Sequence, residues 1–162
     1  MSSPSPGGAQ EFADAPPVHA DERMRQLHGY WLGIHPAAGV LPGRQHLDPT
    51  AIAMLLPFVW LADVQREPLR FRYRLLGTEH ARVFGRDYTG WWLDETHANF
   101  AASPGYHQYL AAVEERRAGY RRGHTLVMLP KDYRSIERLL LPLARDGEEV
   151  DMLLAISLYQ RR

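Results

Sequence analysis

Apolar residues and arginines alternate over residues 69–75, which read LRFRYRL. A period of two along the chain predicts a β-strand, because successive side chains of a strand point to opposite faces of the sheet. Leu69, Phe71, Tyr73 and Leu75 then share an apolar face, and three arginine side chains occupy the other. We therefore expect a strand with one buried face.

A second strand is predicted directly before it, over residues 58–64, which are rich in β-branched and aromatic side chains. The polar stretch 65–68 separates the two runs and predicts the turn of a hairpin. In this hairpin we expect Trp60 to lie opposite Tyr73 on the apolar face. The two rings then contribute to the same side of the sheet.

The remaining pattern predicts four helices and three further strands. The helices are expected over residues 21–32, 48–57, 77–84 and 103–119, and the strands over 124–129, 134–144 and 150–159. The last two strands form a second hairpin, in which Leu139, Leu141 and Leu143 face an equivalent apolar set. Two hairpin-forming blocks around a helical stretch indicate an α+β fold, with helices on the inner face of one antiparallel sheet.

The composition is that of an ordinary globular protein. The chain has 162 residues, of which 45% are hydrophobic and 23% charged, and its formal net charge is zero. We expect a single domain over 21–162 after a disordered tail over 1–20, which is rich in Ser, Pro, Gly and Ala. The balanced charge favours neither nucleic acid nor a membrane surface as a partner. The tail lacks the features of a secretory signal, so a cytoplasmic location is expected.

Candidate catalytic and metal chemistry is sparse. The chain contains no cysteine, which excludes disulfides, thiolate catalysis and cysteine-ligated metals. Its histidines show no HExxH motif or paired spacing, so no metal site is predicted. The acids Asp87, Asp94 and Glu95 lie near His97, but acids in such a loop are more typical of helix caps and solvated turns. We therefore predict no catalytic residue.

Several short segments, taken in order, carry a family resemblance. They are YW at 30–31, LDP at 47–49, LLP at 55–57 followed by WLADV at 60–64, FRYRLLGT at 71–78, GRDYTG at 85–90, and LLLPLA at 139–144 before DG at 146–147. In this order the chain resembles a bacterial PAS-like family of stand-alone domains with unassigned function.

The resemblance implies a five-stranded antiparallel sheet with helices on one face and an N-terminal helical cap. PAS domains serve as sensors or dimerisation modules, and some hold haem, flavins or small metabolites, so the cofactor of this chain is unknown. One departure is the Trp91–Trp92 pair, which stands where the family has a small or basic residue. We expect these two rings at the mouth of the cavity, where they would argue against a large cofactor.

A PAS-like fold would enclose a candidate pocket for a small apolar or aromatic molecule. The predicted lining residues are Trp60, Phe71, Tyr73, His80, Phe84, Trp91, Tyr106, Tyr109 and Leu141. Aromatic residues on a sheet are more often plain core, and that reading stays open. His80 is the best single ligand-binding candidate, as an axial haem ligand or a hydrogen-bond partner, although a lone histidine is more often satisfied by its neighbours.

The face that carries Arg70, Arg72 and Arg74 allows three interpretations: a solvated face, a face covered by the N-terminal helix or a partner chain, and an anion site. Asp63 is expected opposite Arg70, which disfavours an anion site. The candidate interface residues on the N-terminal helix and this face are Met24, Leu27, Tyr30, Trp31, Val59 and Leu61. They predict a homodimer or a contact with a signalling protein.

Together these patterns predict a PAS-like sensory or regulatory module that binds a small molecule or a protein partner in signal transduction, without catalysis. The alternative from another class is a small α+β enzyme of the cone-shaped isomerase or dehydratase kind, which also wraps helices on a curved sheet. Such enzymes usually place a His/Asp pair inside the cone, and we find no such pair in the sequence.

Overall fold

The computed structural model describes residues 10–124 and 133–161, which form a six-stranded antiparallel sheet with helices on both sides. The strands are β1 (Glu11–Ala13), β2 (Val59–Gln65), β3 (Arg70–Leu76), β4 (Gly119–Gly123), β5 (Tyr133–Leu143) and β6 (Met152–Arg161). Their order across the sheet is β1-β4-β5-β6-β2-β3. The helices are α1 (Glu22–Gly33), α2 (Thr78–Phe84), α3 (Leu93–Thr96) and α4 (Tyr106–Glu114), with 3-10 helices η1 (Arg44–His46), η2 (Pro49–Phe58) and η3 (Phe100–Ala102). The predicted α+β class is confirmed, with β1 as an additional strand.

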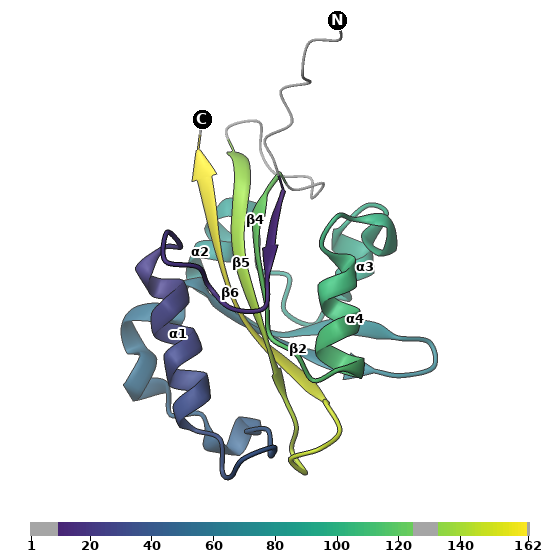
Figure 1. Ribbon diagram of the computed structural model, residues 1–162. Coiled ribbons are helices and arrows are strands. Elements are labelled where there is room, and N and C mark those ends of the chain that lie inside the picture. The colour runs from purple at the N-terminus through teal and green to yellow at the C-terminus, as the bar shows by residue number, and fades with distance from the viewer. Residues whose placement is uncertain (1–9, 125–132, 162) are drawn as a thin grey trace, which may run out of the picture.

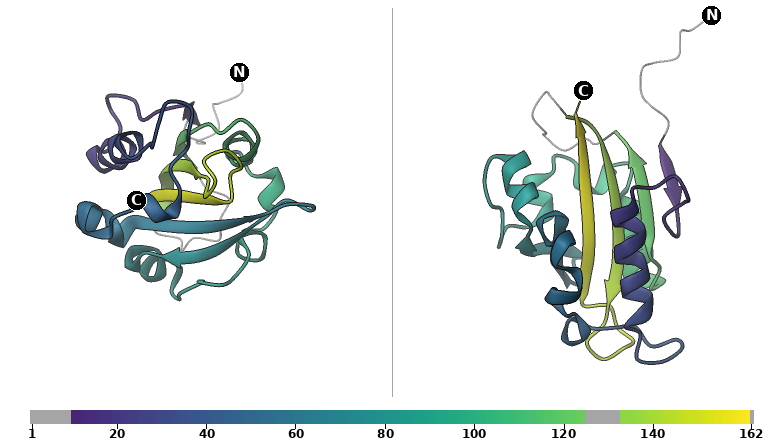
Figure 2. Two further views of the ribbon diagram at one scale, coloured as in Figure 1. Left: turned by 90° about the horizontal axis from the view of Figure 1, so that it is seen from below. Right: turned by 90° about the vertical axis from the view of Figure 1, so that its left-hand side faces the viewer.

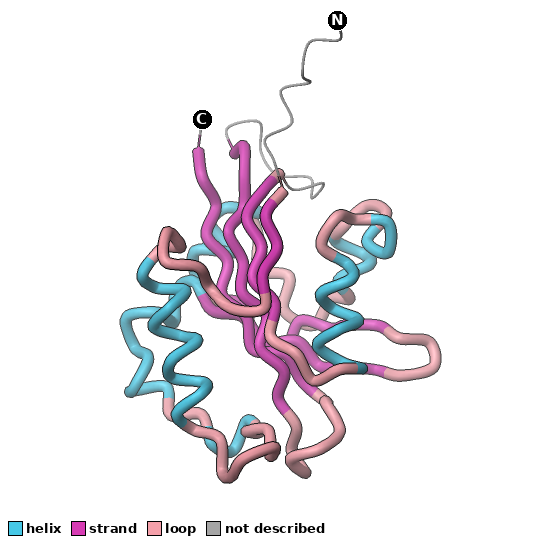
Figure 3. The backbone as a smooth tube through the Cα atoms, viewed as in Figure 1, coloured by secondary structure: helices cyan, strands magenta, loops and turns pink. Residues whose placement is uncertain are grey.

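The two helical layers lie on opposite faces of the sheet (Figure 1). Glu137 on β5 accepts a hydrogen bond from the backbone N–H of Asp21, at the start of α1, at 3.2 Å. The next residue, Arg138, donates to the side chain of Gln108 on α4 at 3.0 Å. Because consecutive strand residues point to opposite faces, α1 and α4 must cover opposite sides. Figure 2 shows α1 running along the strands, and Figure 3 shows the strands as a band between the helices.

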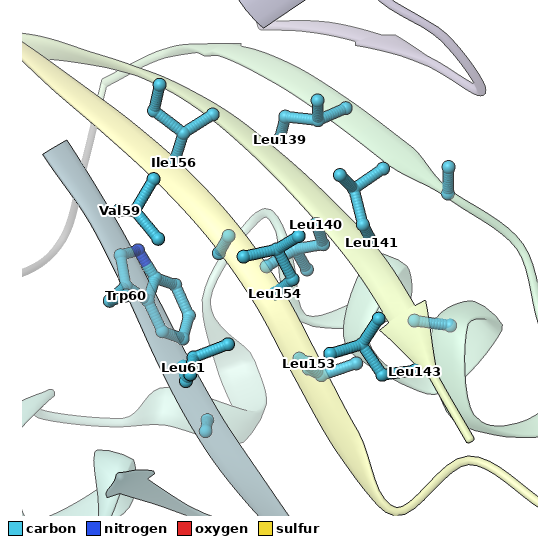
Figure 4. Packing of buried hydrophobic residues seen from close by; sticks show 14 of the residues in the cluster. Val59, Trp60, Leu61, Leu139, Leu140, Leu141, Leu143, Leu153, Leu154 and Ile156 are labelled. Carbon is cyan, nitrogen blue, oxygen red and sulfur yellow. The ribbon is translucent and has the colours of Figure 1, made fainter. Parts of the chain in front are cut away.

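The α1 side of the sheet is a continuous apolar surface. Two rows of cross-strand neighbours run over β2, β6 and β5, namely Val59–Ile156–Leu139 and Leu61–Leu154–Leu141 (Figure 4). All six side chains are buried, and each contributes about 1.5–3 kcal/mol through its burial. The expected pairing of the β5 and β6 apolar sets is confirmed. Leu141, however, was predicted in the pocket. It shares a cross-strand row with Leu154 and Leu61, and Leu61 points to the face opposite Trp60, so Leu141 faces α1 instead.

α1 buries its own apolar stripe on this surface. Asp21 caps the helix, since its side chain accepts from the backbone N–H of Arg23 at 2.9 Å. Met24, Leu27 and Trp31 follow at helical spacing and are buried. Trp31 also reaches the sheet backbone, where its indole N–H donates to the carbonyl of Pro142 at 3.0 Å.

The candidate dimer interface is therefore corrected. Met24, Leu27 and Trp31 are buried against the same face that carries Val59 and Leu61, so α1 and the sheet cover each other within one chain. Tyr30 is half-buried, and its hydroxyl accepts from the backbone N–H of Asp48 at 2.7 Å. The sequence pattern located an apolar contact correctly but assigned it to a second chain, because periodicity does not tell what covers an apolar face.

The β2–β3 hairpin is present, and β3 is the edge strand. Its register differs by two residues from the expected one, because Tyr73 pairs with Ala62 rather than with Trp60. A β-bulge between Leu61 and Ala62 adjusts the pairing further along the strand. A shift of two keeps Phe71 and Tyr73 on their predicted face. Trp60 and Tyr73 therefore still meet, with ring centroids 5.5 Å apart. Leu75, beyond the bulge, pairs with Leu61 and is 40% exposed, so its predicted place on the apolar face is wrong.

Two segments depart from the predicted layout. β1 lies inside the predicted disordered tail and pairs antiparallel with β4, since the open edge of β4 supplies backbone partners that composition does not reveal. Residues 1–9 lie outside the described residues. The third predicted strand, 124–129, falls outside them except for residue 124. The described strand β4 instead occupies 119–123, where the end of a helix was expected, because α4 ends at Glu114.

Candidate functional site

A small cavity lies on the side of the sheet opposite α1, beneath the segment from α3 to α4. Its volume is about 40 Å³. The lining residues are Trp60, Tyr73, His97, Ala98, Phe100, Ser103, Pro104, Tyr109, Arg121, Ile136, Arg138, Ser157 and Tyr159. Of the predicted pocket residues, Trp60, Tyr73 and Tyr109 are part of this lining.

The volume limits what the cavity can hold. One water molecule needs roughly 10–15 Å³ by the same measure, so the cavity accommodates about three waters or one small polar group. Sites for larger ligands span roughly 300–1,000 Å³. Haem and flavin do not fit this cavity, and the residues around it offer no site for a group of that size.

Aromatic rings with polar tips form one wall. The indole N–H of Trp60 donates to the hydroxyl of Ser157 at 2.9 Å, and Tyr73 packs edge-on against the Trp60 ring. Phe100 packs against Tyr109 with centroids 5.0 Å apart, also edge-on. Such edge-to-face pairs stabilise specific ring orientations. Burial raises the pKa of both tyrosine hydroxyls, so they remain neutral hydrogen-bonding groups.

Two arginines also line the cavity. Arg121 on β4 and Arg138 on β5 are direct cross-strand neighbours and are 4% and 6% exposed. Arg138 donates to Gln108 at 3.0 Å, and its guanidinium lies 4.8 Å from the centre of the Tyr109 ring. Gly105, at the start of α4, packs so closely on both side chains that a Cβ there would lie 2.7 Å from Arg138 Nη2 and 2.9 Å from Arg121 Cδ.

His97 completes the polar part of the lining. Its Nδ1 lies 2.9 Å from the hydroxyl of Thr96 and 3.2 Å from the carbonyl of Leu93. Burial, together with the positive charge of Arg138, lowers the pKa of His97 to about 4. The imidazole is therefore neutral at neutral pH.

A sheet of this order, with a cavity between one face and a run of short helices, is the arrangement expected from the sequence resemblance. The chain matches the family of the PAS domain over residues 20–157. The chain belongs to the PAS domain family. The structure of an RNA-binding light-oxygen-voltage receptor has a similar fold, with a TM-score of 0.50 and 15% sequence identity over 96% of this chain.

The PAS domain described here spans 40% of the length of that receptor chain. At 15% identity the similarity shows a shared fold alone, and the RNA binding belongs to the description of that receptor. No curated protein matches the chain. Among the described residues of this PAS domain, no helix is long and apolar enough to cross a membrane.

His80 of the PAS domain is buried beside the cavity rather than within its lining. Its Nε2 lies 2.8 Å from the carbonyl of Phe58 and its Nδ1 lies 2.9 Å from the hydroxyl of Tyr159. A carbonyl can only accept, so Nε2–H donates to Phe58, and Nδ1 accepts from Tyr159. Burial lowers the His80 pKa to about 4. Both ring nitrogens are thus occupied, and His80 orients Tyr159, which does line the cavity.

The other predicted pocket residues support the cavity from outside. Phe71 is buried behind Tyr109, with ring centroids 5.1 Å apart, and Tyr106 packs edge-on against Phe100. Phe84 stacks on His80 and does not reach the lining. Trp91 is 38% exposed, and it lies next to Tyr88 rather than at the cavity mouth.

The loop that holds Trp91 and Trp92 covers the open edge of β3. The side chain of Arg72 donates to the carbonyl of Gly90 at 2.8 Å. The backbone N–H of Tyr73 donates to the carbonyl of Trp91 at 2.9 Å, and the carbonyl of Tyr73 accepts from the backbone N–H of Gly90 at 2.8 Å. These bonds satisfy an edge strand that would otherwise present unpaired backbone groups. Trp91 and Trp92, which depart from the family pattern, therefore lie beside the edge strand of the sheet and not at the cavity mouth, where they were expected.

The arginines of β3 are bound mainly by this same chain. Arg70 forms a two-pronged ion pair with Asp94, at 2.7 and 2.8 Å, and lies 4.1 Å above the ring of Trp92. Asp63 pairs across the strands with Arg72 rather than with Arg70, which follows from the register shift. The predicted neutralisation of Arg70 is real, but Asp94 provides it.

In the acidic cluster Asp87 and Glu95 form a turn and a cap, as expected, whereas Asp94 forms the ion pair with Arg70. Asp87 accepts from the backbone N–H and the hydroxyl of Thr89 at 2.9 and 2.7 Å. Glu95 accepts from the backbone N–H of Trp92 at 3.1 Å. Within residues 10–124 and 133–161, no group of three or more His, Asp or Glu side chains is placed to hold a metal ion.

Sequence reasoning missed the charged half of the cavity, namely Arg121, Arg138 and His97. One signal was available for Arg138, which lies between Ile136 and Leu140 on a single strand face. An arginine that interrupts an otherwise apolar strand face is a candidate buried charge. No comparable signal marks Arg121, because the strand that contains it was predicted at other residues.

Proposed function

We propose that this PAS domain is a sensory or regulatory module that takes up a small molecule in the cavity between the sheet and α3–α4, without converting it chemically. The supporting observation is the composition of the cavity wall, where the rings of Trp60 and Tyr109 meet converging polar groups of Arg138 and Ser157. An apolar, concave site with a few placed polar groups is the usual form of a small-molecule site.

The segment over the cavity is suited to change position when a ligand binds. It consists of the short helices α3 and η3, joined through Asn99 in a left-handed conformation with φ of 54°. Helices this short contain few internal hydrogen bonds. A ligand larger than the 40 Å³ cavity displaces this segment, and a partner protein or a second copy of the chain reads the displacement. Because α1 covers the predicted interface residues, such a partner contacts other surfaces.

A ligand screen combined with a cavity-filling variant tests the proposal. Thermal shift measurements on the purified chain, with native mass spectrometry on the hits, should reveal small molecules that raise the melting temperature and bind in a 1:1 ratio. Ser157→Leu places added carbon atoms in the cavity and should abolish these shifts. Ser135→Leu is the matched control, because the same exchange occurs on β5 outside the lining.

A screen without any binder would contradict the proposal, and so would hits that bind the Ser157→Leu variant unchanged. The alternative of a cone-type enzyme receives no support from the cavity. His97 contacts Thr96 and the carbonyl of Leu93 instead of an aspartate, so the His/Asp pair that this alternative requires is not found among the described lining residues.

A further inference from the structure

Two guanidinium groups converge on the cavity from adjacent strands. Arg121 and Arg138 are opposite each other in the β4–β5 register, and both side chains are more than nine-tenths buried. Both lie against the backbone of Gly105 and both line the cavity. Two adjacent buried positive charges are unfavourable unless a negative charge compensates them.

The described partners of these groups are all neutral. Arg138 donates to Gln108 at 3.0 Å and, at 3.4 Å each, to the carbonyl of Gly105 and the hydroxyl of Tyr109. Arg121 donates to Gln10 at 3.1 Å and to the carbonyl of His124. Among the described residues, no carboxylate forms an ion pair with either arginine.

One nitrogen of each guanidinium is buried without a hydrogen-bond acceptor. These atoms are the Nε of Arg121 and the Nε of Arg138. Buried polar atoms are almost always hydrogen-bonded, so unsatisfied Nε atoms on two neighbouring arginines of the cavity lining indicate a missing partner. Burial, together with the charge of Arg138, lowers the pKa of Arg121 to about 10. The Arg121 guanidinium therefore remains positively charged at neutral pH.

We propose that Arg121 and Arg138 form an anion subsite of the cavity, and that this subsite binds the carboxylate group of a small organic acid. The planar guanidinium fork matches a carboxylate through paired N–H donors. The volume of about 40 Å³ admits one such group, and the rings of Trp60 and Tyr73 face its carbon skeleton. The first turn of α4 begins at Gly105 and adds the positive end of its helix dipole.

This inference rests on the proposed function, since it names the ligand class of the same cavity. The direct test is a thermal shift titration of the full chain at pH 8 with sodium acetate, against sodium chloride at equal ionic strength. We expect a saturable rise in melting temperature with acetate. Arg121→Gln and Arg138→Gln should weaken acetate binding at least ~10-fold, as expected for a lost charged hydrogen bond.

Matched controls separate the subsite from general charge effects. Arg122→Gln removes the neighbouring arginine, which points to the other face of β4, and should leave acetate binding unchanged. Equal binding to Arg121→Gln, Arg138→Gln and the wild type would overturn the subsite. Equal stabilisation by sodium sulfate or inorganic phosphate would overturn the assignment to a carboxylate.

A measurement on the wild-type chain covers the case in which a variant does not fold. In ¹⁵N–¹H spectra, acetate should shift the Nε–H signals of Arg121 and Arg138 and leave that of Arg122 in place. Absence of these shifts overturns the inference. If neutral molecules from the ligand screen still bind and Ser157→Leu abolishes their binding, the proposed sensory function survives while the anion subsite fails.

Discussion

Arg121 and Arg138 lie directly opposite each other across β4 and β5, both almost completely buried and each with an unsatisfied Nε. This relationship gives the cavity of the PAS domain a chemical character that its aromatic wall alone does not have. Rings such as Trp60 and Tyr109 provide shape and apolar contact. The guanidinium pair adds a strong preference for negative charge, because buried cations are stable only when they are compensated.

The close contact of Gly105 with both arginines predicts a specific effect of substitution. In Gly105→Ala the new Cβ would meet Arg138 Nη2 at 2.7 Å and Arg121 Cδ at 2.9 Å, so both side chains must move. We expect the acetate-dependent rise in melting temperature to fall by more than half. Gly29→Ala is the matched control, since nothing lies within 4 Å of its Cβ and it sits inside α1.

Gly29→Ala should raise the free energy of unfolding by about 0.5–1 kcal/mol and leave acetate binding unchanged. Urea denaturation and the acetate titration measure the two quantities separately. If acetate raised the melting temperature of Gly105→Ala as much as that of the wild type, acetate binding would not depend on the positions of the two guanidinium groups, and the anion subsite would be contradicted.

Two histidines with lowered pKa values, His80 and His97, predict a loss of stability in acid. The folded-state pKa is about 4 for His80 and about 4 for His97, against an ordinary value of 6.5. Between these values the unfolded chain binds more protons, so stability falls as the pH drops below about 6.5. From pH 8 to pH 5 we expect a loss of about 2 kcal/mol per histidine.

Urea unfolding at both pH values measures this dependence. His97→Gln should reduce it by about 2 kcal/mol, because His80 still contributes, and so does His28, whose pKa is also lowered by burial. A His97→Gln variant that loses as much stability on acidification as the wild type would contradict the assignment of His97.

The placement of Leu141 on the α1 side predicts that it contributes to stability rather than to ligand binding. Leu141→Ala removes a fully buried side chain and should lower the free energy of unfolding by about 2–5 kcal/mol. It should also increase hydrogen exchange in α1, which covers that face. Ligand-induced thermal shifts should remain. Their loss in Leu141→Ala would mean that Leu141 contributes to ligand binding, which would contradict its placement on the α1 side.

A buried carboxylate beneath α1 predicts a further stability effect. Glu137 is 2% exposed and accepts hydrogen bonds from the Tyr120 hydroxyl at 2.5 Å and from the backbone N–H of Asp21 at 3.2 Å. Tyr120→Phe removes one donor from this carboxylate and should destabilise the fold by about 1–3 kcal/mol. In a Glu137→Gln background, where no charge remains to be satisfied, the same exchange should cost less.

A double-mutant cycle by urea denaturation measures this difference. Additive effects of Tyr120→Phe and Glu137→Gln would mean that the two side chains are not coupled, which would contradict the hydrogen bond between them.

The architecture was largely readable from periodicity. Alternation over 69–75 located an edge strand and put Phe71 and Tyr73 on the correct face, and this holds despite the register shift because a shift of two preserves the faces. Periodicity could not say which layer covers which face. For that reason Leu141 was placed in the pocket, and Met24 and Leu27 were placed in an interface between chains.

The candidate site was only half predictable. Aromatic residues such as Trp60 and Tyr109 attract attention because their size and spacing fit a pocket. The arginines do not stand out in the sequence, since an arginine in a strand is usually exposed. Their burial depends on pairing between strands, such as that of Arg121 with Arg138, which the sequence pattern does not show. β1 was missed for the same reason, because its partner strand β4 lies about 110 residues further along the chain.

A crystal structure of the wild-type chain grown in sodium acetate would test the central claim most directly. We predict a bound acetate in the cavity, with its oxygen atoms about 2.7–2.9 Å from the Nε atoms of Arg121 and Arg138, in contact with the rings of Trp60 and Tyr73. A carboxylate of the protein itself between the two guanidinium groups, or a cavity without the anion at saturating acetate, would contradict it.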